Sequence, residues 1–346
     1  MTGVAGWDIG GAHLKLARVE GDTIVAAVQL PCALWRGLDE LRRALATALE
    51  GLAPVRRHAV TMTGELADLF PDRAAGVAAI LDVVAEFLPP AAIAPYTTDG
   101  AFISAERARA FPGLVASANW HATSRYLASS LHDGLLLDIG STTTDIVPFT
   151  GGGVAARGMT DVERLATGEL VYTGVVRTPL AAIAPEVPFG GRRVGVMAEY
   201  FATAADAHRL AGTLPEGADL HATADNRGKT LPESRARLAR MIGMDADAAS
   251  EAAWRGLAEA FIRRQTATIE IALERVLSGS DLGADAPVIG AGTGRFLAAE
   301  IARRFGRPHR DFGGTIRAAS PGLRSLASDI APAVAVALLL SREGAA

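Results

Sequence analysis

Two short stretches of this sequence repeat a pattern that suits phosphate chemistry. Residues 8–17 are DIGGAHLKLA, and residues 138–147 are DIGSTTTDIV. Each follows an apolar strand-like segment, turns on glycine and re-enters a strand, so backbone N–H groups at the turn can converge on a phosphate oxygen. An ordinary hairpin with a capping aspartate is the alternative for either copy alone. The repetition favours two related phosphate turns.

The side chains of these two turns are the first candidates for a site. An aspartate does not attract phosphate, but it can hold a hydrated Mg²⁺ that bridges to phosphates, so Asp8 and Asp138 are expected at the metal. Asp145 could join them, and Lys15 could neutralise one phosphate charge. His13 could contact phosphate or only cap the turn. The other groups expected at phosphate are Gly10, Gly11, Gly140, Ser141, Thr142, Thr143 and Thr144.

A third glycine-rich segment lies near the end of the chain. Residues 288–302 are VIGAGTGRFLAAEIA, a strand, a glycine turn and a helix whose N-terminus could face an anion or a nucleoside. The GxGxG spacing, with no suitable acidic residue after a second strand, excludes a dinucleotide site. Close packing of the helix on the sheet remains the alternative. The residues expected at phosphate are Gly290, Gly292, Thr293 and Gly294.

Three other segments contain candidate functional side chains. Glu65, at a strand end, is expected to act as a general base or at the metal, although it could also only serve as a charge at a helix N-terminus. Arg177 could clamp a phosphate or a substrate carboxylate, or form a structural salt bridge. The loop at 225–230 suits a diphosphate or a solvated surface equally, with Asp225 expected at the metal and Arg227 and Lys229 at phosphate. The catalytic candidates are Glu65, Asp145 and Arg177.

Short strand patterns alternate with longer helical ones, which predicts an α/β fold. Expected strands cover 4–7, 13–19, 23–28, 58–63 and 134–138, and expected helices cover 38–52, 73–88, 120–131, 197–210 and 251–277. A strand–glycine–helix unit is expected at 288–305 and a last helix after 329, whereas 151–191 is expected to be irregular. The repeated turns indicate that the chain contains a duplicated unit.

Composition narrows the class of protein. The 346 residues are 49% hydrophobic, enough for a substantial core, with a net charge of −4 and only 5% aromatic residues, so nucleic acid is not an expected partner. Cys32 is the single cysteine, which excludes an intrachain disulfide and a thiolate metal cluster. No uncharged apolar run reaches 18 residues, so no membrane partner is expected and a cytoplasmic location is predicted.

In order and type, these motifs resemble the superfamily of acetate kinase, sugar kinases, Hsp70 and actin. Within it the chain is similar to the hydantoinase/oxoprolinase group, and more narrowly to proteins of the tetrahydromethanopterin-linked one-carbon pathway, the MfnF-type synthases of methanofuran biosynthesis. The segments that carry the resemblance are WDIGGAHLK (7–15), TMTGEL (61–66), DIGSTTTDI (138–146), TGVVRTP (173–179), ADNRGKT (224–230) and the turn at Gly290.

The resemblance implies a two-lobed, actin-like fold of duplicated ribonuclease H-like units, with a ligand cleft between the lobes. One lobe would comprise residues 1–125 and 325–346, and the other residues 126–324. The implied reaction joins aminomethyl-furanmethanol diphosphate to the phenol of γ-glutamyltyramine with release of diphosphate. Both substrates are small molecules, Mg²⁺ is the expected cofactor, and the enzyme could be a homo-oligomer.

Two other functions remain open at this stage. An ATP-dependent kinase or a hydantoinase/oxoprolinase-type subunit would consume ATP. ATP is possible but not favoured, because the first turn has His13-Leu14 where many kinases of the superfamily carry hydroxyl residues. A non-catalytic nucleotide-binding scaffold would bind ligand without turnover. The cation- and hydroxyl-rich loops outside the three shared motifs favour an enzyme.

Overall fold

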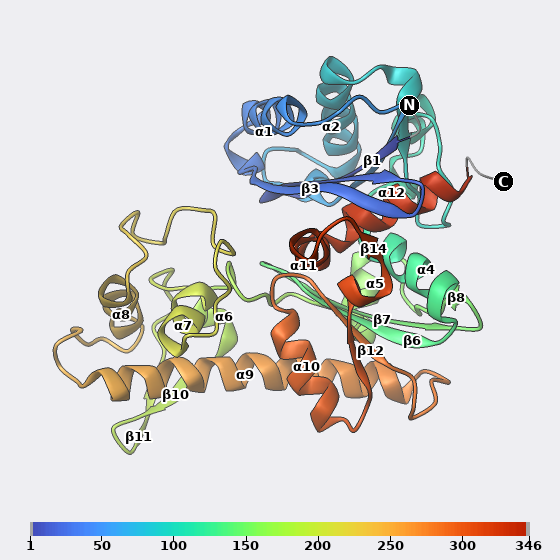
Figure 1. Cartoon of the computed structure of the whole chain (residues 1–346). Coiled ribbons are helices and arrows are strands. Elements are labelled where there is room, and N and C mark those ends of the chain that lie inside the picture. Colours follow the sequence, from blue (N-terminus) through green and yellow to red (C-terminus); the bar gives the residue numbers. More distant parts are fainter. Residues whose placement is uncertain (1–2, 344–346) are drawn as a thin grey trace.

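The computed structural model describes residues 3–343, which form two α/β lobes, each around its own sheet (Figure 1). The first sheet has the order β14-β3-β2-β1-β4-β5, and the second β13-β12-β6-β7-β8 with β9 paired to β7. The strands of the first sheet are β1 (Gly3–Ile9), β2 (His13–Glu20), β3 (Thr23–Pro31), β4 (Arg57–Met62), β5 (Ile93–Pro95) and β14 (Arg317–Ala318). Those of the second are β6 (Gly134–Ile139), β7 (Thr144–Thr150), β8 (Gly153–Val154), β9 (Leu170–Val171), β12 (Val288–Ala291) and β13 (His309–Asp311).

The two sheets repeat one topology. In each, two antiparallel hairpins are followed by two strands added in parallel, so β3-β2-β1-β4-β5 corresponds to β8-β7-β6-β12-β13. The turns agree in detail: the Gly10 N–H donates to the His13 carbonyl at 2.9 Å, and the Gly140 N–H donates to the Thr143 carbonyl at 2.8 Å. The expected α/β class and the duplicated two-lobed fold are therefore confirmed.

Two central helices lie between the sheets. α12 (Ala331–Glu343) packs on β1 and β2, α4 (Asn119–Leu131) packs on β6 and β7, and the two helices contact each other. Figure 1 shows α12 directly beneath the first sheet. Gly6 allows the close approach, because a Cβ at this position would overlap the Ala333 carbonyl oxygen. These helices hold the lobes together at the base of the cleft.

Amphipathic helices cover the outer faces of both sheets. α1 (Leu38–Glu50), α2 (Arg73–Phe87) and α3 (Ala105–Ala110) share one apolar core with the first sheet. α9 (Glu251–Ser278) and α10 (Arg295–Arg304) cover the second sheet. The predicted helices 38–52, 73–88, 120–131 and 251–277 are thus confirmed to within two residues at each end. α11 (Pro321–Asp329), which was not predicted, lies against β3.

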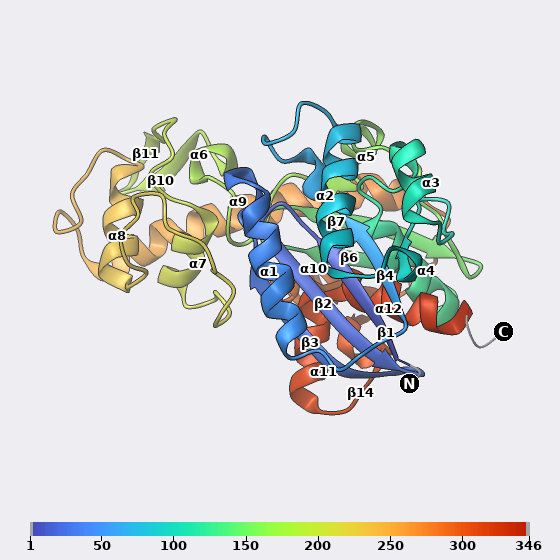
Figure 2. The same cartoon turned by 90° about the horizontal axis from the view of Figure 1, so that it is seen from above.

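The second lobe contains a helical insertion that extends to one side (Figures 1 and 2). It consists of α6 (Leu180–Ile183), the hairpin β10–β11 (Glu186–Phe189 and Arg192–Gly195), α7 (Ala204–Ala211) and α8 (Leu231–Arg240), packed on the first half of α9. The predicted helix 197–210 was wrong at its start, because α7 begins only after Thr203, whose backbone N–H donates to Asp206 Oδ2 at 3.2 Å. The region expected to be irregular, 151–191, contains α5 (Asp161–Thr167) as well as α6 and β10.

The predicted lobe boundaries remain a proposal, with one difference. The range 126–324 would place residues 317–318 in the second lobe, but β14 pairs with β3 of the first sheet. Among residues 3–343, no single helix is long and apolar enough to cross a membrane. α11 and α12 meet the length and composition criteria only as a pair, and that pair is bent by 106°.

Candidate active site between the lobes

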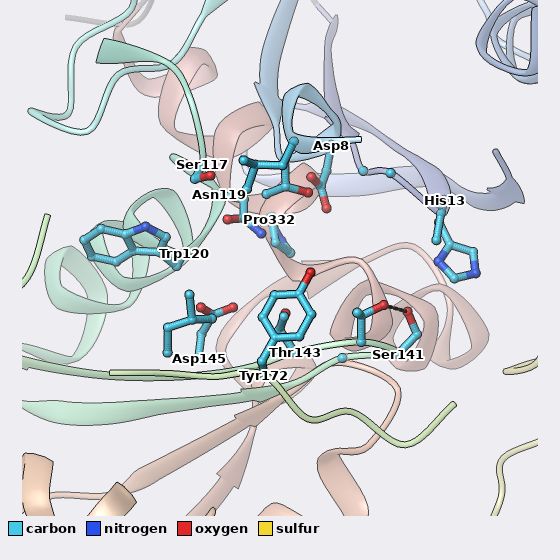
Figure 3. Close-up of a pocket in the computed structure, with 18 of the residues that line it drawn as sticks. Asp8, His13, Ser117, Asn119, Trp120, Ser141, Thr143, Asp145, Tyr172 and Pro332 are labelled. Atoms are coloured by element: carbon cyan, nitrogen blue, oxygen red, sulfur yellow. Dashed lines mark hydrogen bonds between the residues drawn. The ribbon is translucent and has the colours of Figure 1, made fainter. Parts of the chain in front are cut away.

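A cavity of about 460 Å³ lies between the lobes, and both glycine turns open into it. Figure 3 shows its lining, with His13 and Ser141 at one end, Trp120 and Asp145 at the other, and Asp8 and Tyr172 between them. The predicted site residues that line it are Asp8, Gly10, Gly11, His13, Lys15, Asp138, Gly140, Ser141, Thr142, Thr143, Asp145 and Arg177. The fold therefore brings the two predicted turns together.

Asp8 and Lys15 form an ion pair in the middle of the cavity. They are paired across β1 and β2, and Lys15 Nζ lies 3.1 Å from Asp8 Oδ2. Burial alone would lower the pKa of Lys15, but the Asp8 and Asp138 carboxylates together raise it above its ordinary value. Asp8 Oδ1 is buried and has no hydrogen-bond partner among residues 3–343. One carboxylate oxygen thus remains available beside a charged lysine.

Asp138 and Asp145 occupy the corresponding positions of the second hairpin. They face each other across β6 and β7. Burial raises the pKa of Asp138 to about 7, and the negative charge of Asp145 adds to the rise. Burial also raises the pKa of Asp145, whereas the charge of Arg164 opposes that rise. Both carboxylates therefore hold a proton more readily than a solvated aspartate does.

Arg164 fixes the orientation of Asp145. Its Nη2 donates to Asp145 Oδ1 at 2.8 Å and to the Glu169 carbonyl at 3.0 Å. The guanidinium lies over the Trp120 ring, 4.1 Å from the ring centre, and its side chain is only 2% exposed. Trp120 therefore belongs both to the core and to the cavity wall, as the support of a buried ion pair.

At the opposite end of the cavity, Arg177 lies over the Trp35 ring with its guanidinium carbon 4.5 Å from the ring centre. The Arg177 N–H donates to the Ser141 carbonyl at 2.8 Å, which ties this residue to the second turn. His221 of the insertion donates from Nε2 to the Ala12 carbonyl at 2.8 Å and packs against the His13 ring. Burial lowers the pKa of His13 well below its ordinary value, with the charge of His221 adding, so His13 is neutral at pH 7.

Glu65 does not reach the cavity, contrary to the expectation of a direct catalytic role. It is 1% exposed, and its Oε1 accepts a hydrogen bond of 2.9 Å from Ser117 Oγ. Ser117 lines the cavity and has a left-handed backbone with φ of 51°. Burial raises the pKa of Glu65 above its ordinary value. Its position is that of a residue that orients Ser117.

The glycine-rich turn 290–294 does not line the cavity either. The Gly292 N–H donates to the Ser328 carbonyl and the Gly294 N–H to the Ile139 carbonyl, each at 2.7 Å, so neither is free for phosphate. A Cβ on Gly292 would overlap Asp138 Oδ1, and one on Gly294 would lie against the Ile139 side chain. The glycines and Thr293 thus serve the close packing of β12 and α10 on β6.

The remaining predicted residues have structural partners away from the cavity. Thr144 Oγ1 donates to the Thr173 carbonyl at 2.7 Å. In the insertion, Asp225 Oδ1 accepts from Arg237 Nη1 at 3.0 Å and from the Arg227 N–H at 3.2 Å. Lys229 Nζ donates to the Asp219 carbonyl at 2.6 Å. The structure does not bring Asp225, Arg227 and Lys229 to the cavity. Ion pairs hold Asp225 and Lys229 within the insertion, and a backbone hydrogen bond to Asp225 holds Arg227 there.

Several lining residues were missed or left unassigned in the sequence. They are Trp35, Thr63, Asp68, Ser117, Asp161, Arg164 and Tyr172. Asp161 and Arg164 belong to α5, and one signal could have located that helix. Thr160 and Glu163 form a capping box, in which the side chain of each bonds the backbone N–H of the other. The other residues have no local pattern that distinguishes them.

A protein can hold a metal ion with three or more of its own side chains, or with one or two carboxylates together with water and substrate phosphates. The cavity carboxylates fit the second of these two modes. Within residues 3–343, no group of three or more His, Cys, Asp or Glu side chains is arranged to hold a metal ion. Mg²⁺ usually keeps several waters and binds through one or two carboxylates together with substrate phosphates. The unpartnered Asp8 Oδ1 and the Asp138 carboxylate, both at the cavity, fit this second mode. The residues present suit a magnesium–diphosphate complex.

Two sheets of equal strand order, with paired glycine turns at a cavity between them, define an actin-like two-lobed protein. The nucleotide-free structure of acetone carboxylase has a similar fold, with a TM-score of 0.55 and 13% identity over 88% of this chain and 67% of that chain. Residues 56–320 match the hydantoinase/oxoprolinase family, and the chain belongs to this family.

Two archaeal relatives have the same name, (4-{4-[2-(γ-L-glutamylamino)ethyl]phenoxymethyl}furan-2-yl)methanamine synthase. The protein from Methanocaldococcus jannaschii is 34% identical over 245 residues, which cover 70% of this chain and 72% of the relative. The protein from Methanococcus vannielii is 35% identical over 111 residues, which cover 32% of this chain and 50% of the relative. The predicted family resemblance is confirmed.

Proposed function

We propose that this chain forms the ether bond of a methanofuran-type cofactor precursor, from aminomethyl-furanmethanol diphosphate and γ-glutamyltyramine. The phenol oxygen bonds to the furanylmethyl carbon, the bond from that carbon to the diphosphate oxygen breaks, the phenol proton passes to a protein base, and diphosphate leaves. The enzyme is then a furanylmethyl transferase. The observation that carries the proposal is the 34% identity, over 70% of the chain, to a protein named as synthase of this phenoxymethyl-furan compound.

The diphosphate lies between the two turns in this proposal. A furan ring stabilises positive charge on its methylene carbon, so the main catalytic task is to stabilise the departing diphosphate. Preorganised donors do so where the negative charge grows. Lys15, Ser141 and Thr142 line the cavity beside the turns and are suited to that role. Asp8 and Asp138 would hold Mg²⁺ largely through water, and the ion would neutralise part of the diphosphate charge.

The phenol lies at the Trp120 end in this proposal, within reach of Asp145. The ion pair with Arg164 favours the ionised form of Asp145, which can accept the phenol proton, and burial raises the pKa of Asp145 and so its affinity for that proton. Trp120 at this end and Tyr172 in the middle of the cavity provide aromatic surfaces that suit a phenol ring. We place the reaction in the cytoplasm, in the tetrahydromethanopterin-linked one-carbon pathway.

The test is an assay of the purified chain with Mg²⁺ and both substrates, without ATP. We expect the ether product by mass spectrometry, with one diphosphate released for each ether formed. No ether, together with ATP hydrolysis by the same sample, would replace this proposal with the ATP-dependent alternative.

The same assay tests the proposed base. Asp145→Asn should lower kcat by about 10²–10⁴-fold. Its activity should recover as the pH approaches about 10, where the phenol loses its proton without help. Asp285→Asn, at an exposed loop position, is the matched control and should keep the wild-type rate.

A further inference from the structure

At the end of the cavity opposite Trp120, three lining side chains and His221, which packs against two of them, form a group called here the distal cluster. His13 follows the first turn, Trp35 lies in the short 3₁₀ helix Leu34–Arg36, and Arg177 lies beside the second turn. His221 comes from the insertion, and its ring centre is 4.9 Å from that of His13 and 5.3 Å from that of Trp35. Both lobes and the insertion therefore contribute to one local structure.

Arg177 is the unpaired cation of the cavity. Three cationic side chains line it: Lys15, Arg164 and Arg177. Lys15 is paired with Asp8 at 3.1 Å and Arg164 with Asp145 at 2.8 Å. Arg177 has no carboxylate within 4.0 Å in residues 3–343, and its guanidinium lies on an aromatic face instead. A half-buried guanidinium held flat in this way is prepared for an anion with two accepting oxygens.

His13 adds a second unpartnered group at the same place. Its side chain lines the cavity and is 5% exposed, and its Nε2 is buried without a hydrogen-bond partner in the described part of the chain. A buried polar nitrogen without a partner is unfavourable unless a ligand satisfies it. His221 restrains the neighbouring backbone through its bond to the Ala12 carbonyl.

We infer that the distal cluster is a subsite for the terminal phosphate of a diphosphate ester, and that it makes the enzyme select diphosphate over monophosphate esters. This inference rests on the proposed function. The phosphate joined to the furanylmethyl carbon must lie near the reacting groups, Lys15 and Asp145. The second phosphate then extends toward His13 and Ser141, on the other side of Asp8 in Figure 3. Arg177 and His13 contact that phosphate, whereas Trp35 and His221 are positioning residues.

Two unreactive analogues separate the two phosphate positions. Benzyl phosphonate has only the phosphorus group next to the benzylic carbon. The diphosphonate PhCH₂–P(O)(OH)–CH₂–PO₃H₂ has both groups and, like the phosphonate, has a C–P bond in place of the C–O bond that breaks in the reaction. Binding of each to the full chain with Mg²⁺ is measured by titration calorimetry. We expect the wild type to bind the diphosphonate about 100-fold more tightly than the phosphonate. Arg177→Met should weaken diphosphonate binding by about 10–100-fold, the range for a lost hydrogen-bonded charge, and should change phosphonate binding by less than about threefold.

Further variants distinguish a specific subsite from a general structural role. Arg177→Lys keeps the charge without the planar fork and should recover only part of the discrimination. Trp35→Ala should lose the discrimination, and Trp35→Phe should restore it, because the aromatic face is retained. Arg263→Met, on the exposed side of α9, is the matched control. Thermal unfolding of each variant shows whether it is folded.

The inference is overturned if Arg177→Met binds both analogues as the wild type does, or weakens both by the same factor. If Arg177→Met does not fold, the comparison of Trp35→Ala with Trp35→Phe decides in the same way. Discrimination between the analogues without any ether synthesis would retain the subsite and reject the proposed reaction. Ether synthesis by a wild type that does not discriminate would reject the subsite alone.

Discussion

At the residue scale, the two halves hold different charges at corresponding positions. Asp8 faces Lys15 in the first hairpin, and Asp138 faces Asp145 in the second. The first pair is close to neutral. The second places two carboxylates on adjacent strands, which is unfavourable unless a cation or a proton compensates. Arg164 supplies the cation to Asp145, and the pKa of about 7 leaves Asp138 partly protonated. One cavity therefore combines a neutral pair with an acidic one.

A pH-dependent stability is predicted for Glu65. Because burial raises its pKa in the folded protein, the unfolded chain ionises first as the pH rises. Stability should therefore be highest below the unfolded pKa and fall as the pH rises from the unfolded to the folded pKa, by about 1.4 kcal/mol for each pH unit that separates the two values. Glu65→Gln removes this loss. Its thermal unfolding midpoint should exceed that of the wild type at pH 7, and the difference should shrink toward pH 4.

The exposed Glu86 provides a control, because its pKa is shifted in the opposite direction to that of Glu65. Hydrogen bonds from Arg42 lower the pKa of Glu86. Glu86→Gln should therefore lose stability relative to the wild type as the pH rises through the range in which a free glutamate ionises. If the unfolding midpoints of Glu65→Gln and the wild type differ by the same amount from pH 4 to pH 8, burial does not raise the pKa of Glu65 as argued.

At the element scale, the contact of α12 with the first sheet depends on a residue without a side chain. A Cβ at Gly6 would overlap the Ala333 carbonyl, and the helix cannot withdraw because α4 lies on its other side. Gly6→Ala should destabilise the protein by about 3 kcal/mol, measured by denaturant unfolding. Gly256→Ala is the paired control, since Gly256 is exposed within α9 with nothing within 4 Å of the added atom. It should stabilise by about 0.5–1 kcal/mol. Equal effects of the two changes would contradict this account of the packing.

Local patterns explain how much of the architecture could be predicted. The hairpins, the main helices and both glycine turns depend on alternation, helical periodicity and glycine, all of which are visible within about ten residues. The role of the glycine-rich turn stayed open in the sequence because glycine is required equally for tight packing and for ligand approach, and the overlap of a Cβ at Gly292 with Asp138 favours packing. Sequence alone contains no such distance.

Contacts between distant residues explain what could not be predicted in the site. The Arg164–Asp145, Ser117–Glu65 and His221–Ala12 contacts join residues 19, 52 and 209 positions apart. No pattern in either partner identifies the other. The ionic network around Asp225 and Arg237 has the same composition as a diphosphate-binding loop, so composition favoured both interpretations equally.

At the scale of the whole molecule, the cavity is bridged on two sides by contacts between the lobes. On one side, Arg73 at the start of α2 forms an ion pair with Asp161 at the start of α5, with Arg73 Nη2 2.5 Å from Asp161 Oδ2. On the other, the insertion contacts the first turn through His221 and Ala12. Water that entered the cavity could compete with the phenol for the furanylmethyl carbon. In the proposed reaction, these bridges keep the lobes closed while that carbon is reactive.

The last prediction therefore concerns the ratio of products. Arg73→Met removes an ion pair of partly exposed groups, worth about 0.2–1 kcal/mol, so the open state should be populated about 1.4–5-fold more. Diphosphate release should then exceed ether formation, with the furanylmethyl alcohol as the additional product, measured by diphosphate assay and mass spectrometry. Arg109→Met is the matched control, because Arg109 of α3 pairs with Asp82 of α2 at 2.8 Å within the first lobe. It should keep one ether for each diphosphate. If Arg73→Met also keeps that ratio, or if both variants release the same excess of diphosphate over ether, the bridge does not protect the reactive carbon.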